Sequence, residues 1–244
     1  MQGRTVSFGD FWVGYIGPVD AQTAHSHVAI QLAIGLDRDI VIDVAEHAYT
    51  GRGVIVGLEV EHKAMGDDGH WACLYIHPDA PLGRALTARL AGRRAALADA
   101  DILDCFRAAA GLDEFVESLS AMLTNPEVLD TRLHDALDLL RQDRSGPGAV
   151  ARAARAVGLS DSRLRYFAST QMGPPLSQWI ILRKLERASR AMACGAGLTD
   201  AAADGGFSDQ AHLSRMMRRM VGMTPGAAAV FLRETSDSFK IESR

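Results

Sequence analysis

The feature that most constrains this fold is a repeat in the last third of the 244-residue chain. Residues 158–175 read GLSDSRLRYFASTQMGPP, and residues 205–225 read GGFSDQAHLSRMMRRMVGMTP. Both contain Gly, a large apolar residue, Ser and Asp, first at 158–161 and again 48 residues later at 206–209. Two copies at a period of about 50 residues predict one small structural unit used twice.

Each copy is predicted to be a helix, a tight turn and a second helix. The first helices are expected at 149–156 (AVARAARA) and 199–204 (TDAAAD), and a glycine-containing turn follows each of them. Ser160 and Ser208 are placed to cap the second helices by accepting a backbone N–H. This order is that of a helix-turn-helix motif, whose second helix enters the major groove of DNA.

The charge of the chain is divided unevenly, which favours a nucleic-acid partner for the C-terminal part. From residue 145 onward there are 14 Lys and Arg against 8 Asp and Glu, although the whole chain carries a net charge of −4. Basic residues also solvate ordinary helix faces, so charge alone leaves both interpretations open. Two helix-turn-helix patterns in tandem favour DNA.

The segment between the copies is predicted to be one helix over residues 175–193. Pro175 suits the first position of a helix, and an apolar stripe follows. A helix of this length spans about 28 Å, which is close to the ~34 Å between successive major-groove sites on one face of DNA. One chain is therefore expected to read two successive major grooves.

These segments resemble the AraC/XylS-type bacterial transcription regulators over residues 149–233, most specifically in GFSDQAHLSRMMRRMVGMTP. Arg218 and Arg219 are expected to contact the DNA, because Arg side chains neutralise phosphates and bond to guanine. The resemblance implies base-facing residues in the two second helices, namely Ser162, Arg165, Tyr166, Gln210, His212, Ser214 and Arg215.

The N-terminal part predicts antiparallel β-structure with a cluster of histidines. Short alternating apolar segments run to about residue 76, separated by Gly, Asp and Pro. His25 and His27 are two residues apart on a predicted strand, so both project from one face, and Gln31 joins them. With His62 from a later strand they form a candidate site for a divalent transition metal. The same residues could instead line an empty pocket or a pocket for an organic ligand.

Residues 5–80 also resemble the cupin-type sensor domain that is attached to many regulators of the same family. The resemblance implies a small antiparallel β-barrel that binds an effector or a metal ion. Metal-binding cupins usually have Glu where this chain has Gln31, so the metal and the organic-ligand interpretations both stay open.

Helical periodicity begins at Pro81 and predicts helices over residues 82–100, 113–123 and 126–143. A leucine stripe on the last of these either seals it onto the barrel or pairs with a second chain. SGPG at 145–148 is a predicted linker. The predicted class is α+β, with a cupin-like sensor barrel at 1–80, a helical linker or dimerisation region at 81–144, and a double helix-turn-helix DNA-binding domain at 145–244.

Three isolated cysteines predict a reducing, cytoplasmic location, and the sequence offers neither a signal peptide nor an apolar run that could cross a membrane. The predicted function is that of a regulator, not an enzyme, that binds double-stranded DNA. Its N-terminal domain is expected to sense a small effector or metal ion and to bias DNA binding or contact with RNA polymerase. The resemblance also implies a homodimer.

Two other functions stay open. One is a metal-dependent cupin enzyme with an appended helical domain, and the other is a regulator whose sensor domain is only a dimerisation platform. Gln31 argues against the enzyme, because metal catalysis favours carboxylate ligands and an open coordination position.

Overall fold

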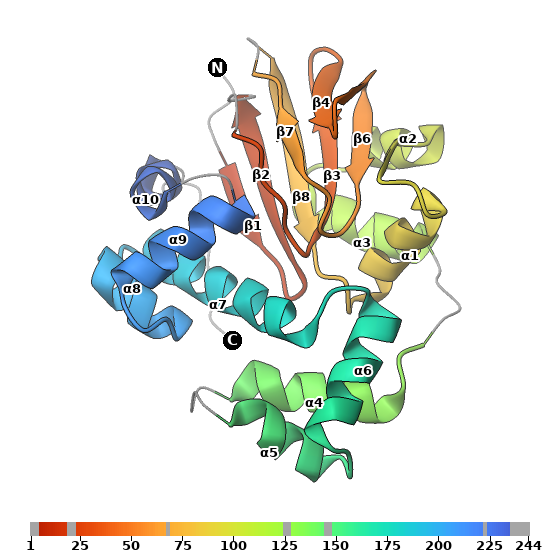
Figure 1. The fold of residues 1–244 in the computed structure, drawn as a ribbon. Coiled ribbons are helices and arrows are strands. Elements are labelled where there is room, and N and C mark those ends of the chain that lie inside the picture. The colour runs from red at the N-terminus through yellow and green to blue at the C-terminus, as the bar shows by residue number, and fades with distance from the viewer. Residues whose placement is uncertain are drawn as a thin grey trace.

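The computed structural model describes residues 5–18, 23–66, 69–123, 128–143, 148–221 and 224–234 (Figure 1). Its strands are β1 (Thr5–Phe8), β2 (Trp12–Pro18), β3 (Ile30–Gly35), β4 (Ile40–Val44), β5 (His47–Gly51), β6 (Gly53–Val56), β7 (His62–Ala64), β8 (His70–Ile76) and β9 (Ala95–Leu97). They form two sheets, ordered β1-β2-β8-β3-β6-β9 and β5-β4-β7, and every pairing is antiparallel, as predicted.

Strand β3 contributes to two cores, which explains why each of its residues is buried. Ala33 faces the three-stranded sheet and packs in one cluster with Ile42 of β4. Leu32 lies on the opposite face and packs in another cluster with helical residues such as Phe115. Alternate residues of β3 therefore face different cores.

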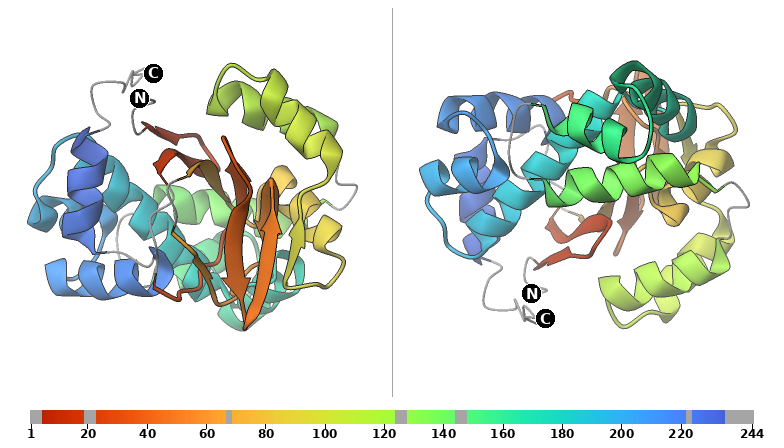
Figure 2. Two further views of the ribbon diagram at one scale, coloured as in Figure 1. Left: turned by 90° about the horizontal axis from the view of Figure 1, so that it is seen from above. Right: turned by 90° about the horizontal axis from the view of Figure 1, so that it is seen from below.

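Helices α1 (Pro81–Leu90), α2 (Ala100–Ala108) and α3 (Leu112–Met122) follow the strands, and Figure 2 shows them beside the sheets. The prediction of one helix over 82–100 is wrong. Ala91 has φ 49° and Gly92 has φ 80°, so the chain leaves α1 in the left-handed region. It turns back to form β9 on the edge of β6, whose backbone groups are thereby paired.

The leucine stripe belongs to the C-terminal helical part. It lies on α4 (Thr131–Gln142), and its side chains share a core with Leu164, Phe167 and Trp179. Both alternatives for this stripe are therefore wrong, because the leucines are buried against the helices that follow. Most of the predicted SGPG linker, like the rest of residues 144–147, lies outside the described residues.

Two helix-turn-helix units follow α4 in the described residues. The remaining helices are α5 (Ala149–Ala156), α6 (Asp161–Met172), α7 (Leu176–Ala193), α8 (Leu198–Gly205), α9 (Gln210–Val221) and α10 (Pro225–Glu234). Helix α7 joins the units and is part of both cores. Trp179 packs with α4 to α6, whereas Ala188 and Met192 pack with α8 to α10.

The helical part is not separate from the sheets. Val6 and Val28 from the N-terminal part lie in the same buried cluster as residues of α7 to α10. The guanidinium of Arg190 in α7 lies over the ring of Phe8 and donates to the carbonyl of Gly9. Figures 1 and 2 show α7 running beside the β1–β2 hairpin.

None of the helices in the described ranges combines the length and the apolar character that spanning a membrane requires.

Candidate functional site

The first helix-turn-helix unit has the predicted geometry. Helix α5 covers 149–156 as expected, and Gly158 in the turn has φ 70°, a conformation that favours glycine. Ser160 caps α6, because its Oγ accepts the backbone N–H of Arg163 at 3.3 Å. The predicted cap at Ser160 is confirmed.

Helix α6 presents its polar face to solvent. Leu164, Phe167 and Ala168 are buried, so the predicted base-facing residues Ser162, Arg165 and Tyr166 are left exposed. The side chain of Arg163 is also exposed, and its guanidinium lies over the rings of Tyr166 and Phe167 at 5.2 and 4.6 Å. The sequence reading missed Arg163, although a helical wheel places it beside Tyr166 at i+3.

The second unit differs from the prediction in its cap. Asp209 rather than Ser208 caps α9, because its Oδ1 accepts the backbone N–H of His212 at 2.6 Å. The hydroxyl of Ser208 instead donates to Asp209 Oδ2. A carboxylate also interacts favourably with the positive end of the helix dipole. The sequence predicted a cap by Ser208 alone, whereas in the structure Asp209 caps the helix and Ser208 donates to Asp209.

Two basic side chains of α7 hold the turn before α9. Lys184 Nζ donates to the carbonyl of Gly206 at 2.6 Å, and Arg187 donates to that of Gly205 at 3.3 Å. These carbonyls end α8 and have no partner within the helix. Part of the basic charge of α7 therefore stabilises the second unit.

Helix α9 exposes most of the residues expected to read DNA. Leu213 and Met217 are buried, and the side chains of Gln210, Arg215, Arg218 and Arg219 are exposed. Ser214 and His212 are half-buried.

The ring of His212 is engaged within the protein. It meets that of Phe207 edge to face at 5.2 Å, and its Nδ1 lies 3.2 Å from Ser208 Oγ. Of the residues predicted on α9, His212 is the one that the turn already holds.

Replacing Gly206 with Ala should destabilise the chain by about 1–2 kcal/mol, because Gly206 has φ 75° and this region is costly for a residue with a Cβ. Side-chain crowding is not the cause, since a Cβ there would lie 3.7 Å or more from its nearest neighbours. Chemical denaturation measures the effect. Gly206→Asn is the matched control, because Asn tolerates the left-handed region, and equal losses in both variants would contradict this account.

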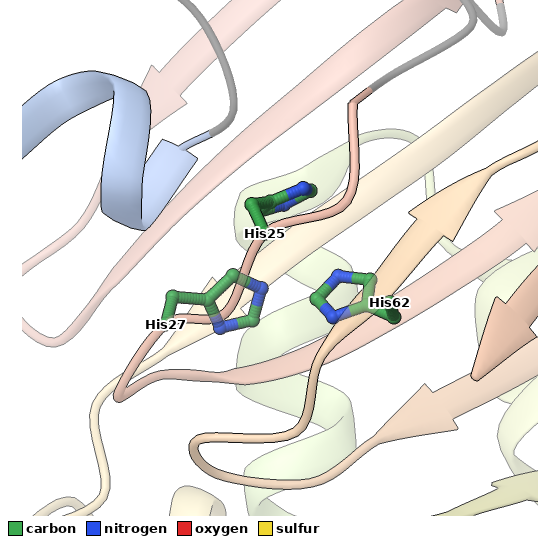
Figure 3. Close-up of side chains that lie close together, drawn as sticks. All are labelled: His25, His27 and His62. Carbon is green, nitrogen blue, oxygen red and sulfur yellow. The ribbon is translucent and has the colours of Figure 1, made fainter. Parts of the chain in front are cut away.

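The predicted histidine cluster is also present. Figure 3 shows the side chains of His25, His27 and His62 pointing toward one another. One candidate ligand atom from each of them lies within 4.8 Å of the others, and all three residues are buried. The expectation that His25 and His27 lie on a regular strand is wrong. Strand β3 begins at Ile30, and His25 forms only an isolated bridge with His62.

Backbone carbonyls fix the protonation of these rings. The Nδ1 atoms of His25, His27 and His62 lie 3.0, 2.8 and 2.9 Å from the carbonyl oxygens of Thr23, Ala29 and Val60. A carbonyl oxygen only accepts, so each Nδ1 carries the proton, and a neutral ring then keeps a lone pair on Nε2. A backbone carbonyl that holds the proton on Nδ1 is typical of histidines that bind metal through Nε2.

Gln31 completes the cluster. Its Oε1 lies 3.1 Å from His27 Nε2 and 2.7 Å from His62 Nε2. With both Nδ1 atoms protonated, three lone pairs meet without a hydrogen between them. The Nε2 of His25 is buried and has no hydrogen-bond partner among the described residues. A half-turn of the Gln31 amide would satisfy the other two rings but not His25, whereas a cation would satisfy all of them.

Burial keeps these histidines neutral. It lowers the pKa of His25, lowers that of His27 to about 4 and lowers that of His62 to about 3, and repulsion between the rings acts in the same direction on His27 and His62. Neutral imidazole is the form that binds metal, so the cluster is ready to accept an ion at neutral pH.

Comparison with known proteins concerns the C-terminal helices and the overall fold. Residues 153–229 match the family model of a helix-turn-helix domain. The fold is similar to that of ToxT from Vibrio cholerae, with 10% sequence identity, a TM-score of 0.60, and coverage of 92% of this chain and 100% of that chain. A structure of wild-type ToxT from strain SCE256, bound to an unsaturated fatty acid, has 12% identity and a TM-score of 0.58, with coverage of 93% and 98%. No curated protein matches the chain.

The helix-turn-helix match and the two-part fold define a class of protein, the chains in which a helix-turn-helix domain follows an N-terminal part built of β-sheets. The helix-turn-helix domain predicted from the repeat is confirmed by this match, which covers residues 153–229. At 10–12% identity, the likeness to ToxT extends to the fold alone.

Proposed function

We propose that this regulator reads two successive major grooves with α6 and α9. The observation that supports the proposal most directly is that both helices bury their apolar faces and expose their basic and polar ones. Helix α7 between them has 18 residues and so spans about 27 Å. This length suits recognition helices that are held about one turn of DNA apart.

In this proposal the two helices share the base contacts, and the remaining arginines bind phosphate. Arg163 joins the set, since its guanidinium is exposed beside Tyr166. The residues proposed to contact base edges are Ser162, Arg165, Tyr166, Gln210, Ser214 and Arg215. His212 is proposed to support the turn. Arg218 and Arg219 are proposed to contact the DNA phosphates.

Replacing Arg215 with Ala should cost about 1–3 kcal/mol of binding and relax preference at one or two base pairs, because an Arg bonds bidentately to guanine. Arg219→Ala should weaken all sequences alike and reduce the slope of log affinity against log salt by about one, because one phosphate contact is lost. Binding of the full chain to operators with single-base changes, at several salt concentrations, measures both effects. Identical specificity profiles for the two variants would contradict the proposed reading face. A binding constant of the wild-type chain that does not change with salt concentration would contradict the proposed DNA binding itself.

The division of labour along the chain follows from the same proposal. Residues 1–80 form the body of the sensor, and 81–144 connect it to the DNA-binding region at 145–244. Two contacts refine these limits. Strand β9 extends the sensor sheet beyond residue 80. Helix α4 shares its core with α5 to α7, so the proposed DNA-binding region includes α4.

The sensor ligand in this proposal is a divalent transition metal. His25, His27 and His62 would bind it through Nε2 and Gln31 through Oε1, which is a three-nitrogen, one-oxygen set that suits zinc. The support is the convergence of unprotonated Nε2 atoms described above. The cluster brings together no carboxylate within the described residues, which favours sensing over metal-dependent catalysis.

A second candidate ligand is a small organic anion. A cavity of about 490 Å³ lies where β1, β2 and β3 meet α2, and Ile16, Ile34 and Phe106 contribute apolar surface to it. Arg52 and Arg107 supply positive charge at the same cavity. One ToxT structure is described as bound to an unsaturated fatty acid, a ligand with a carboxylate and an apolar chain.

The proposed partners are double-stranded DNA, a second copy of the chain and RNA polymerase. Since the leucine stripe of α4 is buried within the protomer, a homodimer would need another surface.

A further inference from the structure

The loop between β8 and α1 carries a buried carboxylate that contacts two helices of the C-terminal region, α4 and α7. The side chain of Asp79 is 1% exposed. Its Oδ1 accepts the indole N–H of Trp179 in α7 at 2.9 Å, and its Oδ2 pairs with the guanidinium of Arg141 in α4. One side chain of the proposed sensor domain is therefore bonded to two different helices of the proposed DNA-binding region.

These bonds fix α4 against α7. The guanidinium of Arg141 also lies over the Trp179 ring, 5.7 Å from its centroid, so the three side chains form a closed triangle. Trp179 is fully buried, and a buried indole N–H needs an acceptor, which Asp79 supplies. Removing the Asp79 carboxylate would take away the hydrogen-bond acceptor of the Trp179 indole and an ionic partner of the Arg141 guanidinium.

The same loop holds α7 at a second point. His77 Nδ1 accepts from Arg183 at 3.0 Å, and His77 Nε2 lies 3.4 Å from Glu186. Glu186 in turn pairs with Arg183 at 2.7 Å and with Arg190 at 3.1 Å. Helix α7 is thus held to the loop over two turns, whereas α4 is held through Asp79.

The consequence concerns the two recognition helices. Helix α6 packs with α4 and with Trp179 of α7 in the first core, and α9 packs with α7 in the second. Because α6 packs on both α4 and α7, a change in the angle between α4 and α7 would move α6 and so change the angle between α6 and α9. Resting on the proposed function of these helices, we propose that Asp79 is a positioning residue that sets the spacing between the two DNA sites that the protein accepts.

The test compares spacing profiles of full-length proteins. An operator is first selected from random duplexes with the wild-type chain, and a series is then made in which the spacer between its two half-sites is lengthened or shortened by one to five base pairs. The wild-type chain should lose about a hundredfold in affinity away from its optimum, because the second helix no longer engages. Asp79→Asn, which keeps an acceptor for Trp179 but loses the charge that pairs with Arg141, should flatten this profile to less than about tenfold.

Asp99→Asn is the matched control, because it removes a carboxylate from an exposed pair with Arg89 in the same part of the chain. It should leave the profile unchanged. A merely structural role for Asp79 would lower affinity at every spacing alike, and an Asp79→Asn profile that keeps the wild-type shape would overturn the proposal.

A second variant keeps the test valid if Asp79→Asn does not fold. Trp179→Phe retains an aromatic ring in the core and removes the N–H that Asp79 accepts, so it should also broaden the profile, and an unchanged profile would overturn the proposal. A wild-type chain that binds no duplex, or binds every spacing equally, would instead contradict the proposed function itself.

Discussion

Zinc should raise the unfolding temperature of the wild-type chain and leave that of a His25→Ala/His27→Ala variant unchanged. An ion that binds only the folded state adds about 4 kcal/mol of stability at a free concentration 1,000 times its Kd. For a chain of this length, that corresponds to a rise of about 10 °C. Thermal unfolding followed by circular dichroism, with and without zinc after removal of metal by a chelator, measures it.

The control for this experiment removes two histidines that lie elsewhere. His47 and His134 are exposed, so His47→Ala/His134→Ala should keep the full shift and report any binding of zinc to surface imidazoles. Each protein is compared with itself, so a lower starting stability of the cluster variant does not obscure the result. Equal shifts in the two double variants would refute the metal site.

Acid should destabilise the fold in part through His77. Burial lowers the pKa of His77 to about 3, whereas the unfolded chain takes up this proton near pH 6.5. The contribution of His77 is therefore fully present above pH 6.5 and is lost as the pH falls toward 3. The loss is at most about 1.4 kcal/mol for each pH unit.

The difference between wild type and His77→Gln isolates this contribution. The buried histidines of the cluster act in the same direction but are present in both proteins. Urea unfolding at pH 7, 6 and 5 should show a shallower pH dependence for His77→Gln, whose amide oxygen can still accept from Arg183. Parallel curves for His77→Gln and wild type would contradict the prediction.

The parts of the fold that sequence predicts well are those fixed by local rules. The repeat predicts both helix-turn-helix units, because a Gly with positive φ, a capping residue and an apolar spacing of four each have a local cause. Gly158 and Ser160 behave as expected. The histidine cluster follows from strand periodicity even though His25 lies outside a regular strand, because its extended backbone still places the ring beside His62.

The missed features depend on contacts between distant segments. Strand β9 reads as part of a helix in AGRRAALADA, and only the free edge of β6 makes it a strand. The spacing of the leucines in α4 predicts that they are buried, but it does not predict which helices they pack against. Asp79 follows a proline in a short loop and has no motif around it, and its partner Trp179 is 100 residues away.

Helix α7 has a consequence for how such a regulator can change its target. Because Trp179 is fixed in one core and Met192 in the other, inserting a single residue between them would rotate one core about the helix axis by about 100° relative to the other. Only insertions of three or four residues restore the facing of α6 and α9, and each adds about 5 Å of length. Operator spacing in proteins built this way is therefore expected to evolve in steps set by one turn of the α-helix that joins the two units. Intermediate lengths of this helix are excluded, because they would rotate α6 and α9 out of their common facing.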